Sequence, residues 1–266
     1  MILFLIYFLV LGLIVGSFLN VVILRYNTGE SLGGRSGCFS CGHGLAWFEM
    51  IPVASFIALK GQCKHCRSRI SRQYPVVEIL TGILFALSVW KFYPDFLSIF
   101  FYCVLLCLLV VVVVYDLKHK IITDMPIYLF IALSIMAPAI LGFYRSSVET
   151  IGLQILSNVG GGLVIFLFFF SLWYFSGGRW MGFGDAKVGF GMGALLGLSG
   201  AANAVILAFW AGAVVGLSLI ALGKLKFKKL KSFKRRFSIK SEIPFAPFLV
   251  LGLVLSLFWN VSIFVF

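Results

Sequence analysis

Charged residues are scarce in this 266-residue chain: they make up 12% of it, and only nine of them are Asp or Glu. The remainder is 61% hydrophobic and 17% aromatic, with 29 phenylalanines. Because soluble globular domains carry roughly 25% charged residues, this composition excludes one. Long apolar runs separated by short polar segments are typical of a polytopic helical membrane protein.

The first apolar segment lacks the marks of a cleaved signal peptide. No basic residue precedes it, and no small-residue cleavage site of the Ala-x-Ala kind follows it. We therefore expect a retained helix. The chain also lacks an apparent internal repeat or low-complexity tract.

Eight segments are apolar enough to be interpreted as membrane spans. They lie near 2–24, 76–93, 96–115, 125–143, 153–176, 187–200, 201–222 and 244–264. The sixth is short and rich in glycine, which allows close packing of helices. The sequence thus predicts an all-α polytopic membrane protein of about eight transmembrane helices. Its expected parts are a first transmembrane helix (1–24), a small cysteine-rich insertion (25–75) and a transmembrane domain (76–266).

Basic residues are divided unequally between the two sides that these spans imply. Of the 22 Lys and Arg, all but Lys91 and Arg145 fall on one side, which the positive-inside rule makes cytoplasmic, with both termini outside. The densest run, Lys224 to Lys240, could bind nucleic acid. We expect instead a topology anchor that contacts anionic membrane lipids, and no nucleic-acid partner.

Four cysteines in the insertion have metal-ligand spacing. Cys38-x2-Cys41 and Cys63-x2-Cys66 are separated by a short stretch, and two such pairs can close a tetrahedral zinc site. Disulfides are the alternative, but thiols stay reduced in the cytoplasm. We expect zinc in a structural role, because four Cys ligands leave no open position for a substrate.

Two aspartates lie at the ends of apolar segments. Asp116 ends the run Val110 to Tyr115, and Asp185 stands in Gly182-Phe183-Gly184-Asp185. Spans 3 and 6 run in opposite directions, so both carboxylates are expected at one membrane face. Two carboxylates that share a proton can activate water. The alternative for each is a helix-end residue at the interface without catalytic function.

Three kinds of residue around these aspartates are candidates for active-site support. Gly182 and Gly184 allow backbone or substrate to approach Asp185 closely. Lys187 either lowers the pKa of a neighbouring carboxylate or only marks the cytoplasmic boundary of the membrane. Asp124 is interpreted as the N-terminal cap of the fourth span.

Taken in order, the motifs of this chain resemble those of the type IV prepilin peptidase family, which are G-x-G-D aspartic proteases. The resemblance covers most of the chain and departs from the family at Thr123, where Pro is usual. The motifs that carry it are Gly16-Ser17-Phe18-Leu19-Asn20 with Arg25; the two Cys pairs; Ile51-Pro52-Val53 with Ser55; Tyr74-Pro75-x2-Glu78; Tyr115-Asp116 followed by Ile122-Thr123-Asp124; and Gly182-x-Gly184-Asp185-x-Lys187.

The resemblance implies a bacterial inner-membrane endopeptidase with Asp116 and Asp185 as catalytic residues and 76–266 as the protease domain. Its substrate would be a type IV prepilin or a type II secretion pseudopilin, cut after a Gly at the cytoplasmic face. Relatives with the cysteine domain then methylate the new N-terminus using S-adenosylmethionine.

The residues give that second reaction little support of their own. No Rossmann-type glycine fingerprint is apparent. Glu49 and Glu78 are weak candidates for binding the cofactor. Their alternative interpretations are a surface acid and a helix-dipole acid, respectively.

Two other classes of function fit parts of the sequence. A proton-coupled transporter also needs membrane acids, but its acids usually lie at the midplane. A zinc-dependent membrane scaffold would need no catalytic acid at all. Replacing Asp116 or Asp185 by Asn separates these hypotheses from a peptidase.

Overall fold

The computed structural model describes the chain except residues 30, 32, 35, 143–147, 226–243 and 260–266. The basic run Lys224 to Lys240 lies almost entirely outside the described residues. The described elements are α1 (Ile2–Arg25), η1 (Trp47–Met50), α2 (Ala54–Ala58), α3 (Gln73–Phe92), α4 (Phe96–His119), α5 (Asp124–Gly142), α6 (Val148–Ser176), α7 (Phe183–Leu225) and α8 (Ala246–Trp259). Only isolated β-bridges occur beside these helices, so the predicted all-α class is confirmed for the described part of the chain.

Six of the described helices are long and apolar enough to cross a membrane. They are Ile2–Arg25, Gln73–Phe92, Phe96–His119, Asp124–Gly142, Glu149–Ser176 and Phe183–Leu219. The described part of α8 is shorter. In hydrocarbon every backbone N–H and C=O must bond within the segment, which is why these apolar runs are helices. The number of membrane crossings, for which the sequence suggests about eight, stays a prediction.

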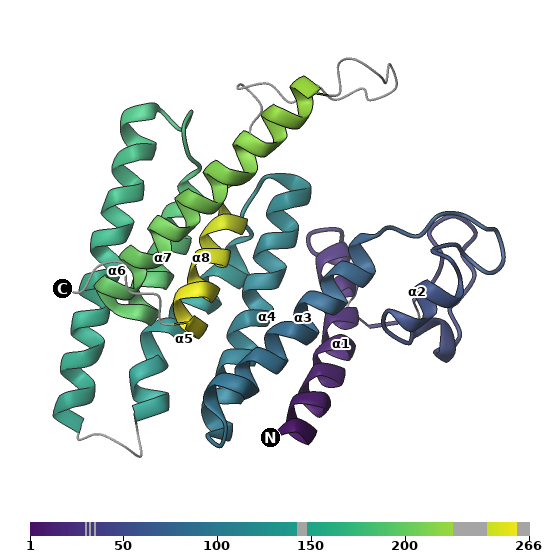
Figure 1. Cartoon of the computed structure of the whole chain (residues 1–266), viewed down its shortest axis with the longest axis horizontal. Helices are drawn as coiled ribbons and strands as arrows, with labels where there is room; N and C mark the ends of the chain where they lie inside the picture. The colour runs from purple at the N-terminus through teal and green to yellow at the C-terminus, as the bar shows by residue number, and fades with distance from the viewer. Residues whose placement is uncertain (30, 32, 35, 143–147, 226–243, 260–266) are drawn as a thin grey trace. The chain divides into compact units, whose positions relative to one another are not determined.

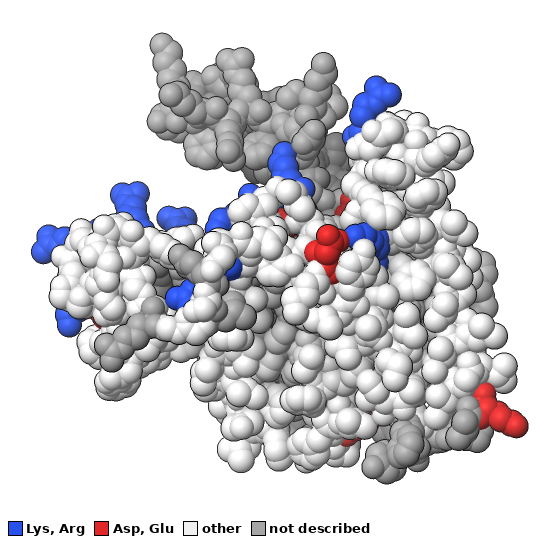
Figure 2. Space-filling view, turned by 180° about the vertical axis from the view of Figure 1, so that it is seen from behind, with Lys and Arg blue, Asp and Glu red and all other residues white. Residues whose placement is uncertain are grey.

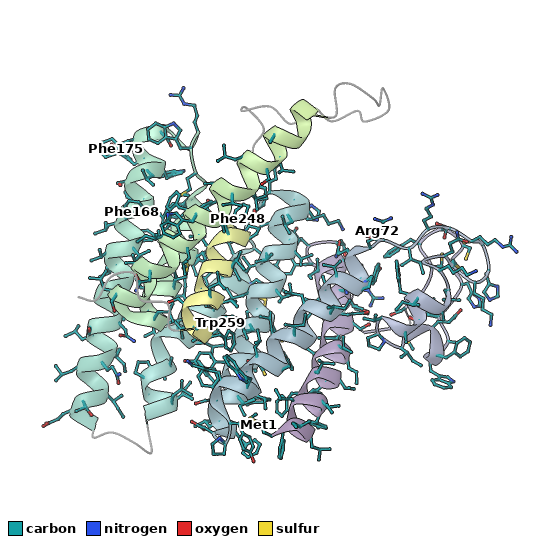
Figure 3. All side chains as sticks on the ribbon, viewed as in Figure 1. Met1, Arg72, Phe168, Phe175, Phe248 and Trp259 are labelled. Carbon is teal, nitrogen blue, oxygen red and sulfur yellow. The ribbon has the colours of Figure 1, made fainter. Side chains whose placement is uncertain are left out.

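Large apolar side chains are exposed along these helices. Phe168 and Phe175 on α6 are 45% and 81% exposed, and Trp259 on α8 is 50% exposed (Figure 3). Charged side chains are sparse over the helical surface seen in Figure 2. In water such a surface would drive aggregation, so it is the surface of a helical protein surrounded by lipid.

The chain divides into two compact units, Met1–Val114 and Tyr115–Phe266. In the first unit α1 lies beside α3 (Figure 1). Glycines make this contact close: a Cβ on Gly12 would come within 2.8 Å of Gly82 Cα, and one on Gly16 within 2.7 Å of Glu78 Cα. Buried Asn20 completes the contact by donating from Nδ2 to the Tyr74 carbonyl (3.2 Å). Small residues and a polar link of this kind are the usual means of joining membrane helices.

In the second unit, α7 consists of two helices joined at Gly197, whose φ of 71° and ψ of 178° are not helical. The chain reverses direction there. Phe169 of α6 contacts the Gly189 position before the bend, and its ring lies 6.4 Å from that of Phe245. The Phe245 ring in turn lies 5.0 Å from that of Phe209 after the bend. Residues before and after Gly197 therefore lie at the same height along the axis of α6, as a reversal of the chain requires.

This reversal agrees with the predicted separation of the sixth and seventh apolar segments, although the break falls at Gly197 and not after residue 200. The second arm of α7 then packs against α8 (Figure 1). Ser256 of α8 donates from its hydroxyl to the Gly200 carbonyl (3.1 Å), and Phe248 lies against Gly212. These pairings make the second arm and α8 antiparallel.

Candidate active site

Asp116 lies in the last turn of α4. The backbone N–H of Lys120 donates to the Asp116 carbonyl (2.7 Å), and Lys120 has a φ of 56°, which ends the helix. The Asp116 side chain is nevertheless buried, with 5% exposure. Burying a carboxylate at a helix end costs free energy, so a carboxylate found there is usually functional or paired.

Asp185 is the third residue of α7 and is also buried, with 6% exposure. Its Oδ2 accepts a hydrogen bond from the Gly182 N–H (3.3 Å), and its own N–H donates to the Gly182 carbonyl (3.1 Å). This is half of a capping box. The helix start thereby fixes the orientation of the carboxylate, and the positive end of the helix faces it.

The structure brings Asp116 and Asp185 close enough for their charges to interact. A second contact holds the two motifs together, because Gly184 packs directly against Ile122 in the loop after α4. A Cβ on Gly184 would come within 2.7 Å of Ile122 Cδ1 and 2.9 Å of its Cβ. The two aspartates therefore lie near each other, where α4 ends and α7 begins.

Lys187 pairs with Asp124 rather than with either buried aspartate. Its Nζ lies 2.6 Å from Asp124 Oδ1 and also sits over the rings of Tyr128 (4.8 Å) and Phe183 (5.5 Å). Helix α5 begins at Asp124, so Thr123 is its N-cap. The expected capping role of Asp124 is therefore wrong: its carboxylate joins α5 to α7.

The four cysteines of the insertion come together, as the spacing predicts. Their Sγ atoms all lie within 4.8 Å of one another, and those of Cys38 and Cys66 are 3.7 Å apart. Four ligands at about 2.3 Å around a tetrahedral zinc ion lie roughly 3.8 Å from one another. The donor set and its spacing fit zinc, and all four thiols are free of disulfides.

The two Cys pairs have the same backbone geometry. Cys38 N–H donates to the His43 carbonyl, and Gly42 N–H donates to the Cys38 carbonyl; Cys63 makes the matching bonds with Ser68 and Arg67. The fourth residue after each first Cys has positive φ: 70° at Gly42 and 57° at Arg67. Such tight turns direct backbone N–H groups at the sulfurs and favour their ionised form.

The thiols of the site differ in acidity. A hydrogen bond from Ser68 lowers the pKa of Cys38 to about 5, and Ser68 lowers the pKa of Cys66 as well. A backbone bond from His43 acts in the same direction on Cys41, but desolvation and the neighbouring sulfurs raise its pKa to about 11. Four thiolates therefore require a cation, and metal ligands must be deprotonated.

The structure contradicts the alternative interpretation of Glu49 as a surface acid and that of Glu78 as a helix-dipole acid. Glu49 is buried, not a surface acid, and its Oε2 accepts from the Ala46 N–H (2.8 Å). Glu78 lies beyond the first turn of α3, so it is not a dipole acid; it is buried and accepts from the Val53 N–H (2.8 Å). Both contacts are those of structural links, and they identify no binding site for S-adenosylmethionine.

Two features of the site were not found from the sequence. Val53, a β-branched residue, has a φ of 60° at the start of α2, where its N–H meets Glu78. Thr123 is buried and its Oγ1 has no hydrogen-bond partner among the described residues. A signal for the latter existed: Pro126 removes one of the donors that a capping Thr uses.

Family models match most of the chain. Residues 10–92 match the bacterial peptidase A24 N-terminal domain, and residues 103–217 match the type IV leader peptidase family. Asp116 and Asp185 both lie in the second range, and the four cysteines lie in the first.

The chain is also similar in sequence to curated proteins, two of them over almost its whole length. The prepilin leader peptidase/N-methyltransferase of Burkholderia pseudomallei (strain 1026b) is 29% identical over 95% of this chain and 84% of its own. That of Pseudomonas aeruginosa is 26% identical over 95% and 89%. That of Myxococcus xanthus is 50% identical over 34% of this chain and 27% of its own. No solved structure matches the chain.

Proposed function

Since the chain belongs to the type IV leader peptidase family and is a membrane peptidase, we propose that it cleaves the leader of a type IV prepilin or type II secretion pseudopilin after a Gly, at the cytoplasmic face. The observation that carries the proposal is the pair of buried, interacting aspartates, Asp116 and Asp185. The relatives' names supply the prepilin leader as substrate, and the family resemblance of the motifs supplies the pseudopilin and the cut after a Gly.

The chemistry is that of an aspartyl dyad. One carboxylate is ionised and takes a proton from the attacking water, and the other is protonated and donates to the scissile carbonyl oxygen. Like charges this close cannot both ionise readily, so the pair titrates as a unit. Gly182 N–H orients Oδ2 of Asp185, and the absence of a side chain at Gly184 lets Ile122 and its loop approach.

The ion pair of Lys187 and Asp124 supports the dyad by joining its two motifs. Because the pair is neutral, it leaves the negative charge of the site on the two aspartates. A basic leader peptide is complementary to that charge. Lys187 and Asp124 are therefore positioning residues in this mechanism.

The cysteine cluster serves folding and not hydrolysis. When zinc is bound, Cys38, Cys41, Cys63 and Cys66 hold it, and the ion supplies folding free energy to an insertion too small for a large core. Methyl transfer from S-adenosylmethionine to the new N-terminus is proposed from the relatives' names alone.

The test is cleavage of a prepilin by purified protein in detergent, with the cut position determined by mass spectrometry. Asp116→Asn and Asp185→Asn should each lower kcat by at least ~10²–10⁴, the contribution of acid–base assistance. Glu149→Gln is a matched control, because Glu149 is an exposed acid in the first turn of α6. Near-normal cleavage by either Asp variant would refute the dyad. A transporter or a scaffold would not cut the peptide at all.

A further inference from the structure

Thr123 is a buried hydroxyl that the peptidase mechanism above does not use. Its side chain is 4% exposed, and its Oγ1 has no hydrogen-bond partner in the described part of the chain. Leaving a buried hydroxyl unpaired costs about 1–3 kcal/mol. Exceptions of this kind in a well-packed protein require a physical reason.

The other buried hydroxyls in the described part of the chain have hydrogen-bond partners. Thr81, Ser88 and Ser134 each donate to the backbone carbonyl four residues earlier, at 2.8, 2.9 and 2.8 Å. These residues lie inside helices, where such a carbonyl is always near. Thr123 stands before the first turn of α5, so no preceding turn of its own helix offers it a carbonyl.

The usual partner of a capping Thr is also missing. The Thr123 carbonyl accepts from the Ile127 N–H (3.4 Å), which identifies Thr123 as the N-cap of α5. A capping hydroxyl normally accepts from the N–H of the second or third helical residue. The third is Pro126, which has no N–H. The second is Met125, whose N–H does not bond Thr123 Oγ1 either, so the hydroxyl makes no cap bond in this structure.

The position of Thr123 links both aspartate motifs. It lies in the connection that follows Asp116, and its two neighbours contact the segment that carries Asp185. Ile122 packs on Gly184, and Asp124 pairs with Lys187. Thr123 is therefore held between two contacts that flank Asp185 in sequence.

We propose that Thr123 Oγ1 hydrogen-bonds a backbone peptide group of the bound substrate, beside the bond that the dyad cuts. A peptide entering a buried site loses its hydrogen bonds to water and needs replacements. A hydroxyl can donate to a peptide carbonyl or accept from a peptide N–H. The inference rests on the proposed function, because it assigns a residue to the substrate of that same site.

The test compares Thr123→Val and Thr123→Ser in cleavage of a prepilin peptide and in thermal unfolding without substrate. Thr123→Val keeps the shape and removes the hydroxyl, so kcat/KM should fall about 5- to 150-fold, which is 1–3 kcal/mol. Its unfolding temperature should stay level or rise, since an unpaired hydroxyl is removed. Thr123→Ser should retain most of the activity.

Thr81→Val is the matched control, since it removes a buried hydroxyl that already has a partner. It should lower the unfolding temperature and leave cleavage unchanged. Wild-type kcat/KM in Thr123→Val would overturn the inference alone. A lower unfolding temperature of that variant without substrate would also overturn it, by showing an internal partner such as an enclosed water. A wild-type enzyme that does not cut the peptide refutes the proposed function and the inference together.

Discussion

Replacing Gly184 by Ala should damage the site through a single methyl group. The new Cβ would lie 2.7 Å from Cδ1, 2.9 Å from Cβ and 3.0 Å from Cγ1 of Ile122. Carbon atoms in ordinary contact are about 3.5–4.0 Å apart. Rotation of the Ile122 side chain can move Cδ1 away, but Cβ is attached to the backbone. The loop that connects Asp116 to α5 must therefore move by roughly 0.6 Å or more.

Two costs follow from this movement. Overpacking of this kind destabilises by about 1–3 kcal/mol. The displaced loop also carries Thr123 and Asp124. The ion pair of Asp124 with Lys187 connects this loop to the helix that bears Asp185, so moving the loop disturbs the dyad. A misplacement near 1 Å costs up to about 10² in rate, so kcat/KM for prepilin cleavage should fall between tenfold and a hundredfold.

The assay combines cleavage kinetics with thermal unfolding in detergent. Gly160→Ala on α6 is the control, because a Cβ there meets nothing within 4 Å and Ala is the better helix former by ~0.5–1 kcal/mol. Adding Ile122→Ala to Gly184→Ala should restore part of the activity. The recovery should be incomplete, since Cβ of residue 122 stays 2.9 Å away. Wild-type behaviour of Gly184→Ala, or purely additive effects in the double variant, would refute the reasoning.

The remaining predictions concern the cysteine insertion. Protein never exposed to chelator should contain one zinc per chain by metal analysis, and a metal-free wild type would contradict this. Cys63→Ser should abolish zinc binding and speed proteolysis of residues 25–75. The helix content of the variant, measured by circular dichroism, should stay the same. Glu78→Ala should lower stability by about 1–3 kcal/mol in thermal unfolding, because it leaves the part-buried Val53 N–H unpaired. Glu78→Gln, which keeps an acceptor, should cost less, and equal losses in both variants would argue against the hydrogen bond.

Features set by local sequence were predictable. Apolar runs become helices because the bilayer leaves the backbone no other way to bond. Two Cys-x2-Cys pairs on one short insertion are the usual pattern of a four-Cys metal site. The structure brings the four Sγ atoms within 4.8 Å of one another. The opposite directions of their spans predicted only that Asp116 and Asp185 lie at one membrane face, and not that they are neighbours.

Features set by contacts between distant segments were not predictable. Whether Asp124 caps its own helix or reaches Lys187 is decided by where α7 places Lys187, which lies 63 positions further along the chain. Glu78 looked like an acid at a helix start, but packing of the insertion against α3 buries it beneath Val53. The unpaired state of Thr123 depends on the fold of this turn, in which neither Met125 nor Pro126 gives its hydroxyl a cap bond, and on burial that only the folded loop creates.

The reversal at Gly197 has a consequence for biogenesis. A hairpin enters a bilayer as one unit from the side on which both its ends remain. In such a hairpin the Asp185 end of α7 and its Leu225 end are delivered to the same side of the bilayer. The nine Lys and Arg between Lys224 and Lys240, which resist translocation, would retain the second arm and thereby keep Asp185 from being carried across. During synthesis, the orientation of the first arm would stay uncommitted until the ribosome has made residues well beyond the catalytic motif.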